Sequence, residues 1–297
     1  MRGYRLTGRG KFVFIVFVIV SLASVLGLKK AAMSGDGAEY AIRDAWYLSD
    51  PYCELDEMEL SETAMAFISE MGEAHETFAG NSDFDDKEGF LSVNVEDIRS
   101  YDSGKLAFLT FDDGPSANVT PLVLDILDDY GIKATFFVLG CMGEKNGAVL
   151  NDINSRGHSI GIHTYSHNFK ELYKSEKSFL NELKLSEDVL RQNLGDEFST
   201  RLFRFPGGSF EDYKTQFVKA LNDKGYVSVD WNAVTGDAES KNPTHEMLLE
   251  RLKNTVENKN KIVVLMHDSA AKQVTAEALP DIIEYLISQG YRFAVLK

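Results

Sequence analysis

The chain has 297 residues, of which 44% are hydrophobic, so it can form one large domain or two ordinary ones. Its formal net charge of -15 argues against nucleic acid as a partner, because a phosphate backbone would be repelled. Two cysteines, Cys53 and Cys141, are too few for a disulfide scaffold. We expect both to be free thiols, with a single bridge as the alternative.

The charge is spread unevenly and divides the chain into three parts. Residues 1–30 carry six Lys or Arg and no acid, whereas residues 31–100 carry eighteen Asp or Glu against three bases. Residues 101–297 carry twenty-eight acids against twenty-two bases. We therefore predict a leader at 1–30, an acidic segment at 31–100 and a separate domain at 101–297.

The leader has the features of a membrane anchor. Arg2, Arg5, Arg9 and Lys11 precede an apolar run over residues 12–28, and Lys29 follows it instead of a clear cleavage site. We favour an uncleaved anchor over a cleaved signal peptide. The excess of basic residues before the run predicts a cytoplasmic N-terminus and an extracellular location for the rest of the chain.

Residues 31–100 are strongly acidic, which is typical of a segment without a packed core. Ser61 is a candidate cap for one short amphipathic helix, since apolar residues recur at helical spacing between Leu60 and Met71. We predict a stalk that holds the next domain away from the membrane.

From about residue 101 the pattern alternates between strands and helices. Helices are expected after most strands, including a long one capped by Ser175 and another capped by Thr244. This order predicts an α/β fold in which a parallel sheet is covered by helices, with a small barrel favoured over an open doubly wound sheet. The expected strands cover residues 106–111, 134–139, 159–163, 202–205, 226–229, 262–266 and 293–296.

Polar residues collect where these strands end. The carboxyl ends of parallel strands share one edge, so residues far apart in sequence should meet there. Two histidines four residues apart and one carboxylate are a set that suits a divalent metal. The alternatives are surface histidines and a structural ion-pair network. The residues concerned are Asp112, Asp113, His163, His167, Arg204, Asp230, Asp237 and His267.

Such a set can hydrolyse an amide. A metal polarises a carbonyl and acidifies water, a carboxylate takes the proton of the water, and a second group must protonate the departing nitrogen. Arg204 would keep the carboxylate base ionised, and Asp237 would hold His267 in its charged form. Gly207 or Gly208 could bring a backbone N–H close to an oxyanion.

The domain resembles the polysaccharide deacetylases of carbohydrate esterase family 4, over roughly residues 103–297. The motifs that carry the resemblance occur in order along the chain: Thr110-Phe111-Asp112-Asp113-Gly114, His163-x-x-x-His167, Arg204-x-Pro206-x-Gly208, the loop with Asp237, and Leu265-x-His267.

The resemblance implies a distorted (β/α)7 barrel and a divalent metal, usually Zn²⁺. By analogy, Asp113, His163 and His167 are the metal ligands. Asp112 is the catalytic base, and Arg204 orients it.

The same resemblance implies that His267 is the general acid and that Asp237 tunes it. Gly207 would donate its N–H to the oxyanion, and Leu265 would line the acetyl pocket. Tyr165, within the histidine motif, is a further predicted substrate contact. The Asp-x-x-Asp-Trp motif of the family departs here, with Val234 at its first Asp and Ala238 at its Trp, so we expect a wider pocket wall near Asp237.

We therefore expect a metal-dependent enzyme that removes N-acetyl groups from N-acetylhexosamine units of an extracellular polysaccharide and releases acetate. An anchored catalytic domain outside the cell favours peptidoglycan as the substrate. The alternatives are chitooligosaccharide or O-acetylated xylan as substrate, secretion after signal cleavage, a non-catalytic glycan-binding wall protein, and a signalling ectodomain.

Overall fold

The computed structural model describes residues 91–98 and 104–297. The predicted leader, nearly all of the predicted stalk, and Cys53 lie outside the described residues. No helix in the described ranges has both the length and the apolar character that crossing a membrane requires.

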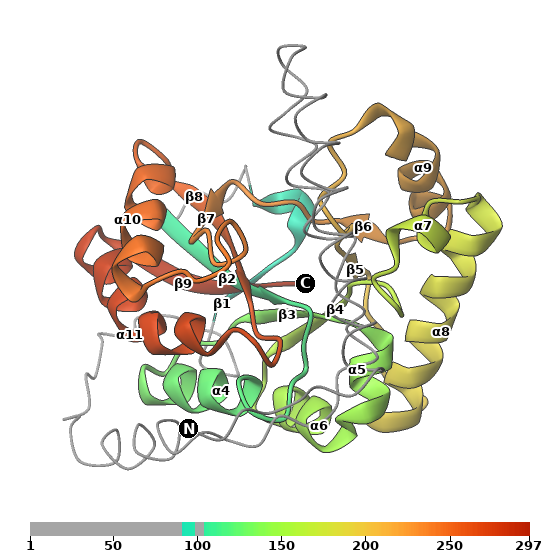
Figure 1. Cartoon of the computed structure of the whole chain (residues 1–297), viewed down its shortest axis with the longest axis horizontal. Coiled ribbons are helices and arrows are strands. Elements are labelled where there is room, and N and C mark those ends of the chain that lie inside the picture. Colours follow the sequence, from blue (N-terminus) through green and yellow to red (C-terminus); the bar gives the residue numbers. More distant parts are fainter. Residues whose placement is uncertain (1–90, 99–103) are drawn as a thin grey trace, which may run out of the picture. The chain divides into compact units, whose positions relative to one another are not determined.

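The described strands form one curled parallel sheet (Figure 1). The neighbour order β6-β5-β4-β3-β2-β8-β7 forms the curve, and β9 joins β2 to β1 at the start of β2. No pairing between β6 and β7 is present in the described ranges, so the barrel is not closed by hydrogen bonds. The strands are β1 (Leu91–Val93), β2 (Lys105–Asp112), β3 (Thr135–Val138), β4 (Ser159–Ile162), β5 (Leu202–Phe203), β6 (Val227–Ser228), β7 (Ala233–Val234), β8 (Lys261–His267) and β9 (Tyr291–Leu296).

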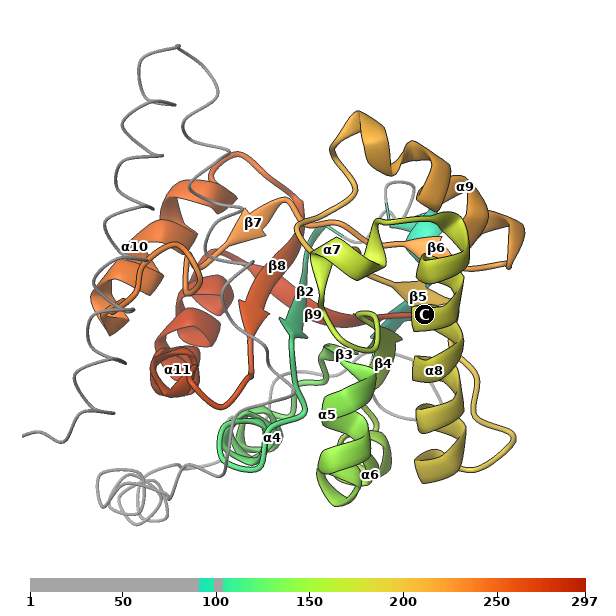
Figure 2. The same cartoon turned by 45° about the vertical axis from the view of Figure 1, so that its right-hand side comes forward.

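Helices lie along the outside of the sheet (Figure 2). Ser175 and Thr244 accept hydrogen bonds from the backbone at Ser178 and Met247, so both predicted helix caps are confirmed. The helical elements are η2 (Val95–Asp97), α4 (Thr120–Asp129), α5 (Gly140–Lys145), α6 (Gly147–Ser155), α7 (Phe169–Leu172), α8 (Glu176–Leu194), η3 (Asp212–Lys214), α9 (Thr215–Asp223), α10 (His245–Val256) and α11 (Gln273–Ser288).

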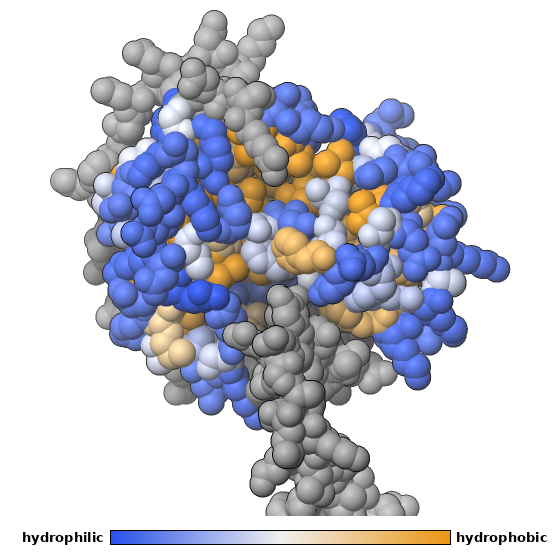
Figure 3. Space-filling model, turned by 90° about the horizontal axis from the view of Figure 1, so that it is seen from above, coloured by the Kyte–Doolittle hydropathy of each residue, from blue (hydrophilic) through white to orange (hydrophobic). Residues whose placement is uncertain are grey.

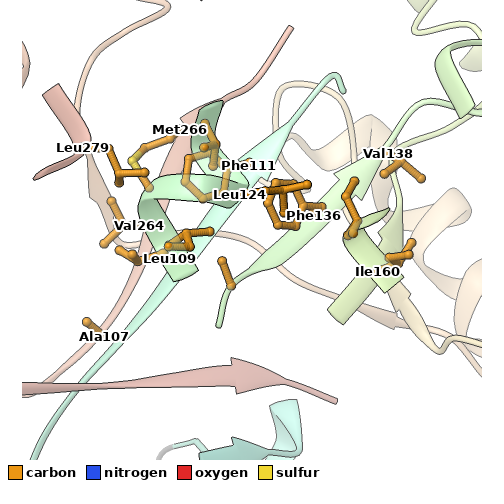
Figure 4. Close-up of a cluster of buried hydrophobic side chains, with 14 of the residues drawn as sticks. Ala107, Leu109, Phe111, Leu124, Phe136, Val138, Ile160, Val264, Met266 and Leu279 are labelled. Atoms are coloured by element: carbon orange, nitrogen blue, oxygen red, sulfur yellow. The ribbon is translucent and has the colours of Figure 1, made fainter. Parts of the chain in front are cut away.

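Side-chain alternation gives the sheet two different faces. On β2, Ala107, Leu109 and Phe111 point outward into the cluster that packs against α4 and α11 (Figure 4). Leu106 and Phe108 point the other way, into a second cluster inside the curl. Thr110 and Asp112 belong to this inner face, so the same pattern that builds the core also turns Asp112 inward.

The other strands with polar ends follow the same rule. Outward residues such as Ile162, Phe203 and Met266 belong to the outer cluster, and the residue that follows each of them points inward. Those inward residues are His163, Arg204 and His267. All three are buried.

Several short elements were missed by the sequence analysis. β7 and α7 are too short to show a periodic pattern, and α5 begins at a glycine directly after β3. The predicted last strand is present as β9, but it pairs with only the first residues of β2. This position differs from that of a regular barrel strand.

Two observations concern the predicted boundary and the cysteines. β1 lies inside the range that was assigned to the acidic segment, yet it pairs with β9 in register Leu91 to Ala294. Cys141 is disulfide-bonded, so the expectation of a free thiol is wrong for this residue. Cys141 is half-buried in the first turn of α5.

Seen from above, the molecule shows hydrophobic residues toward the middle of the visible face and hydrophilic residues around them (Figure 3). This distribution agrees with a curled sheet that has apolar side chains within the curl and a polar outer surface of helices.

Candidate active site

Asp112 and Asp113 stand at the end of β2, and the chain leaves the strand between them. Asp112 is the last strand residue, and its partner in the neighbouring strand β8 is His267. Asp113 has a φ of 73°, a left-handed conformation that few non-glycine residues adopt. Because of this backbone turn, the carboxylates of two consecutive residues can face the same site. Both carboxylates are almost fully buried.

Arg204 fixes the first carboxylate from inside the curl. Its Nη1 donates to Asp112 Oδ1 at 2.8 Å and to Thr110 Oγ1 at 2.7 Å, and its Nε donates to the Val229 carbonyl at 2.9 Å. The guanidinium also stacks over the ring of Phe137 at 4.1 Å. Burial raises the pKa of Asp112, and the charge of Arg204 opposes that rise.

His163 is held in one tautomer. Its Nδ1 lies 2.8 Å from the Arg204 carbonyl, an acceptor only, so Nδ1 carries the proton and Nε2 presents a lone pair. Burial lowers the pKa of His163 to about 3, so the ring is neutral at physiological pH. A neutral imidazole with its second nitrogen anchored is the form that binds metals.

Asp113 lies between the two histidines of the motif. Asp113 Oδ1 is 3.5 Å from His163 Nε2 and 3.6 Å from His167 Nε2. One ligand atom from each of the three residues lies within 4.8 Å of the other two. The predicted ligand set is thus brought together in three dimensions.

The hydrogen bonding of Asp113 fits a cation. Both of its carboxylate oxygens are buried, and neither accepts a hydrogen bond within the described part of the chain. A buried carboxylate that accepts no hydrogen bond is costly, whereas a metal ion would bind the oxygen lone pairs. Two histidines and one carboxylate form a donor set that suits Zn²⁺ and similar divalent ions.

His267 and Asp237 form a second charged pair beside this group. His267 Nδ1 is 2.8 Å from Asp237 Oδ1, and the His267 backbone N–H donates to Asp237 Oδ2 at 2.8 Å. Thr275 Oγ1 also donates to Asp237 Oδ2, at 2.9 Å. His267 Nε2 faces the ligand group, 3.9 Å from Asp113 Oδ2.

The two members of this pair hold each other in their charged forms. Burial alone would lower the pKa of His267, but the charge and hydrogen bond of Asp237 raise it to about 9. Burial would raise the pKa of Asp237, but the charge of His267 outweighs it and the pKa is lowered. His267 therefore carries a proton on the nitrogen that faces the site at neutral pH.

Glu182 of α8 is a site-supporting residue that the sequence analysis missed. Its Oε2 accepts the backbone N–H groups of Tyr165 and Ser166 at 3.0 and 2.8 Å, and its Oε1 accepts the Ser166 hydroxyl at 2.9 Å. The buried carboxylate thereby holds the loop that carries His163 and His167. The signal in the sequence is a charged residue at a position that the helical spacing places among the buried apolar residues of α8.

The glycine turn after Arg204 is held from below by a buried lysine. Gly207 and Gly208 both have positive φ, 71° and 78°. Lys214 Nζ donates to the carbonyls of Pro206 and Gly208 at 3.0 and 2.6 Å and pairs with Glu211 at 2.9 Å. The sequence analysis did not identify this anchor.

Leu265, Tyr165 and Asp230 are the remaining predicted residues, and each has different neighbours. Leu265 is buried on the inner face of β8 and pairs with Thr110 and with Val234 of β7. The Tyr165 hydroxyl donates to Glu144 at 2.7 Å. Asp230 accepts hydrogen bonds from the backbone and hydroxyl of Ser209, so it supports the glycine loop.

Comparison with known proteins agrees with this geometry. The sequence model of the family described as polysaccharide deacetylase matches residues 99–229. A peptidoglycan-N-acetylglucosamine deacetylase of Bacillus cereus is 33% identical over 199 residues, which cover 65% of this chain and 86% of that protein.

Two solved structures share the fold. A carbohydrate esterase family 4 (CE4) esterase of Streptococcus mutans aligns with a TM-score of 0.65 and 36% identity, covering 71% of this chain and 93% of the other. The catalytic domain of a peptidoglycan N-acetylglucosamine deacetylase from Eubacterium rectale aligns with a TM-score of 0.61 and 33% identity, covering 66% and 90%.

The curled parallel sheet, the buried Asp-His-His group and these similarities lead to one assignment. The chain belongs to the polysaccharide deacetylase family and is an enzyme of the deacetylase type.

Proposed function

We propose that this chain is a metal-dependent hydrolase that removes N-acetyl groups from N-acetylglucosamine units of peptidoglycan and releases acetate. The main support is the buried ligand group around Asp113, which is flanked by a carboxylate paired with Arg204 and a histidine paired with Asp237. The names of the relatives, which act on peptidoglycan N-acetylglucosamine, support the choice of substrate.

Asp113, His163 and His167 would hold the metal. A bound divalent ion supplies polarisation of the acetyl carbonyl and lowers the pKa of water. Zn²⁺ is our proposal for the ion, because nitrogen ligands from two histidines with one carboxylate suit it.

Asp112 would act as the base that takes a proton from the attacking water. The hydrogen bond from Arg204 Nη1 occupies Oδ1, which leaves Oδ2 free to face the site, 3.8 Å from His163 Nε2. Because the guanidinium is itself buried and charged, it stabilises the ionised form of Asp112 despite the low-polarity surroundings.

His267 would act as the acid that protonates the leaving nitrogen. An amine leaves poorly as an anion, so an amide substrate needs this proton more than an ester does. The pKa of about 9 keeps His267 protonated at neutral pH, and Asp237 orients its ring through both carboxylate oxygens. This arrangement favours N-acetyl over O-acetyl groups as the substrate.

The oxyanion and the acetyl methyl group would be bound by the loops beside these residues. Gly207 has no side chain to block an approach to its backbone N–H, and Lys214 holds the flanking carbonyls in place. Leu265 supplies apolar surface for the methyl group from the inner face of β8. Tyr165 stays a proposed substrate contact.

We also propose that the catalytic unit includes Leu91–Val93, because β1 completes one edge of the sheet and Glu96 pairs with Arg201 at 2.8 Å. The basic and apolar leader supports a single membrane anchor with the catalytic unit outside the cell, where peptidoglycan lies.

The direct test is acetate release from peptidoglycan, chitooligosaccharide and acetylxylan, each measured with added Zn²⁺ and with a chelator. We expect metal-dependent release that is fastest on peptidoglycan. Release from acetylxylan alone would contradict the N-deacetylase proposal, and the absence of release from all three would contradict the function as a whole.

A further inference from the structure

Large exposed aromatic side chains gather on one loop of the described chain. Phe210 is 58% exposed and Tyr213 is 51% exposed, and both follow the glycine turn at Gly207 and Gly208. Leu185, Met247 and Ile287 are the other large apolar residues with high exposure in the described ranges, and all three lie on helices. Exposed aromatic residues that cluster beside a site commonly mark a binding surface.

Phe210 pairs with a second aromatic residue from another part of the sheet. Its ring lies 5.5 Å from that of Trp231, at an angle of 89°. This edge-to-face contact joins the loop after β5 to the loop between β6 and β7. The two rings therefore form one aromatic surface, which we call the aromatic ledge.

The ledge lies directly over the glycine turn. A Cβ at Gly208 would come within 2.3 Å of Phe210 Cε2 and 3.2 Å of Trp231 Cη2, so both rings rest against its backbone. Gly207, the proposed oxyanion donor, is the adjacent residue, with its Cα about 3.8 Å away. Trp231 also faces Arg204, whose Cζ is 5.7 Å from the ring centroid.

The backbone under the exposed ring is firmly held. Asp230 accepts hydrogen bonds from the backbone N–H and the hydroxyl of Ser209, the residue before Phe210. On the other side, buried Lys214 binds the carbonyls of Pro206 and Gly208. An exposed side chain on a fixed backbone loses little conformational entropy when it binds a ligand.

We propose that the aromatic ledge of Phe210 and Trp231 is a subsite that stacks against a hexose ring of the glycan, next to the unit that carries the reacting acetyl group. The proposal rests on the proposed function, because the ledge adjoins the oxyanion loop and a chain seated there must pass over it. One face of a pyranose ring presents C–H groups, which match the apolar, electron-rich face of an aromatic ring.

The test compares full-length variants on chitooligosaccharides of one to five units. Phe210→Ala should raise KM for the tetramer about 3- to 10-fold, because the contact between one aromatic ring and one hexose ring is lost. The value of kcat should stay within about 2-fold of wild type. The rise in KM should be small for the monosaccharide, which cannot reach both subsites. Phe210→Tyr should restore KM, and the control Met247→Ala, equally exposed on α10, should leave it unchanged.

A second readout does not depend on turnover. Trp46 and Trp231 are the two tryptophans of the chain, so Trp46→Phe leaves Trp231 as the single indole fluorophore. Titration with chitotetraose should change its emission, and adding Phe210→Ala should weaken the apparent affinity by a similar factor. If no acetate is released but the emission changes, the proposed function fails, while binding of a glycan at the aromatic ledge stands.

Two results would overturn the subsite while leaving the proposed function intact. One is an equal change in KM for every chain length in Phe210→Ala, and the other is an unchanged KM for the tetramer. Acetate release by the Trp46→Phe variant without any change in Trp231 emission at saturating chitotetraose would also reject stacking on the ledge.

Discussion

The two halves of the site differ in how their charges are satisfied. In the half that we propose for proton transfer, Asp112 accepts from Arg204 at 2.8 Å, and Asp237 accepts from His267 and Thr275. In the ligand half, Asp113 is just as buried, yet neither of its oxygens accepts a hydrogen bond in the described part of the chain. The carboxylates of the first half are held by hydrogen bonds from protein groups, whereas the oxygens of Asp113 are left for a cation.

The strongest test of this difference is Asp113→Asn. The neutral amide keeps the shape of the carboxylate but is a poor metal ligand, so acetate release should fall by roughly a thousand-fold or more. The same change should raise the thermal stability of the metal-free protein, since it removes a buried carboxylate whose oxygens accept no hydrogen bond in the described part of the chain. Metal analysis and thermal unfolding in chelator measure both effects, and a destabilised metal-free variant would contradict the contrast between the two halves.

His267→Gln should affect the other half alone. Turnover on an N-acetylated glycan should fall about 10²- to 10³-fold, because the leaving nitrogen loses its proton donor. Bound metal should match wild type, as His267 is outside the ligand set. A variant that turns over at nearly the wild-type rate would refute the role of His267 as the acid.

Asp237→Asn should shift the pH dependence. His267 has a raised pKa of about 9, so the acid is protonated below that pH and activity should fall as the pH rises through it. The same linkage predicts that the raised pKa of His267 contributes stability that is fully present below about pH 6.5, the ordinary His value, and is lost as the pH rises through about 9.

Without the carboxylate, the alkaline limb of kcat should move to lower pH, with a loss of about 10- to 100-fold at pH 8. The measurement is a pH–rate profile of both proteins. Superimposable alkaline limbs would show that Asp237 does not set the pKa of the acid.

Glu182→Gln should have the smallest effect. The amide can still accept at one oxygen, but it cannot accept all three donors of Tyr165 and Ser166, so the histidine loop should loosen. We expect metal affinity to weaken about 3- to 10-fold, measured by competition with a chelator. The control is Glu187→Gln on the same helix, whose amide oxygen can still accept the hydrogen bond from the Tyr226 hydroxyl. An equal loss of metal affinity in both variants would mean that a general disturbance of α8 is the cause, and not the loss of the hydrogen bonds that Glu182 accepts.

Much of this site could be predicted from the sequence because it follows strand ends. The carboxyl ends of parallel strands meet at one edge, so Asp112, His163, Arg204 and His267 could be placed together from the sequence. The motif spacing then linked Asp113 and His167 to them. The caps at Ser175 and Thr244 are local signals and were equally readable.

The supporting contacts could not be predicted because they join segments that only the fold brings together. Glu182 reaches the histidine loop from a helix, and Lys214 lies beneath the glycine turn from the segment after it. Neither has a motif of its own. β7 has two residues, too few for an alternating pattern, and the pairing of β9 with the start of β2 depends on the curl of the sheet.

The most direct test of the central claim is metal content measured together with acetate release on the same full-length preparation. We predict a single divalent ion per chain, loss of both metal and activity on chelation, and recovery of both when Zn²⁺ is returned. Undiminished release of acetate by protein shown to be free of metal would contradict the account.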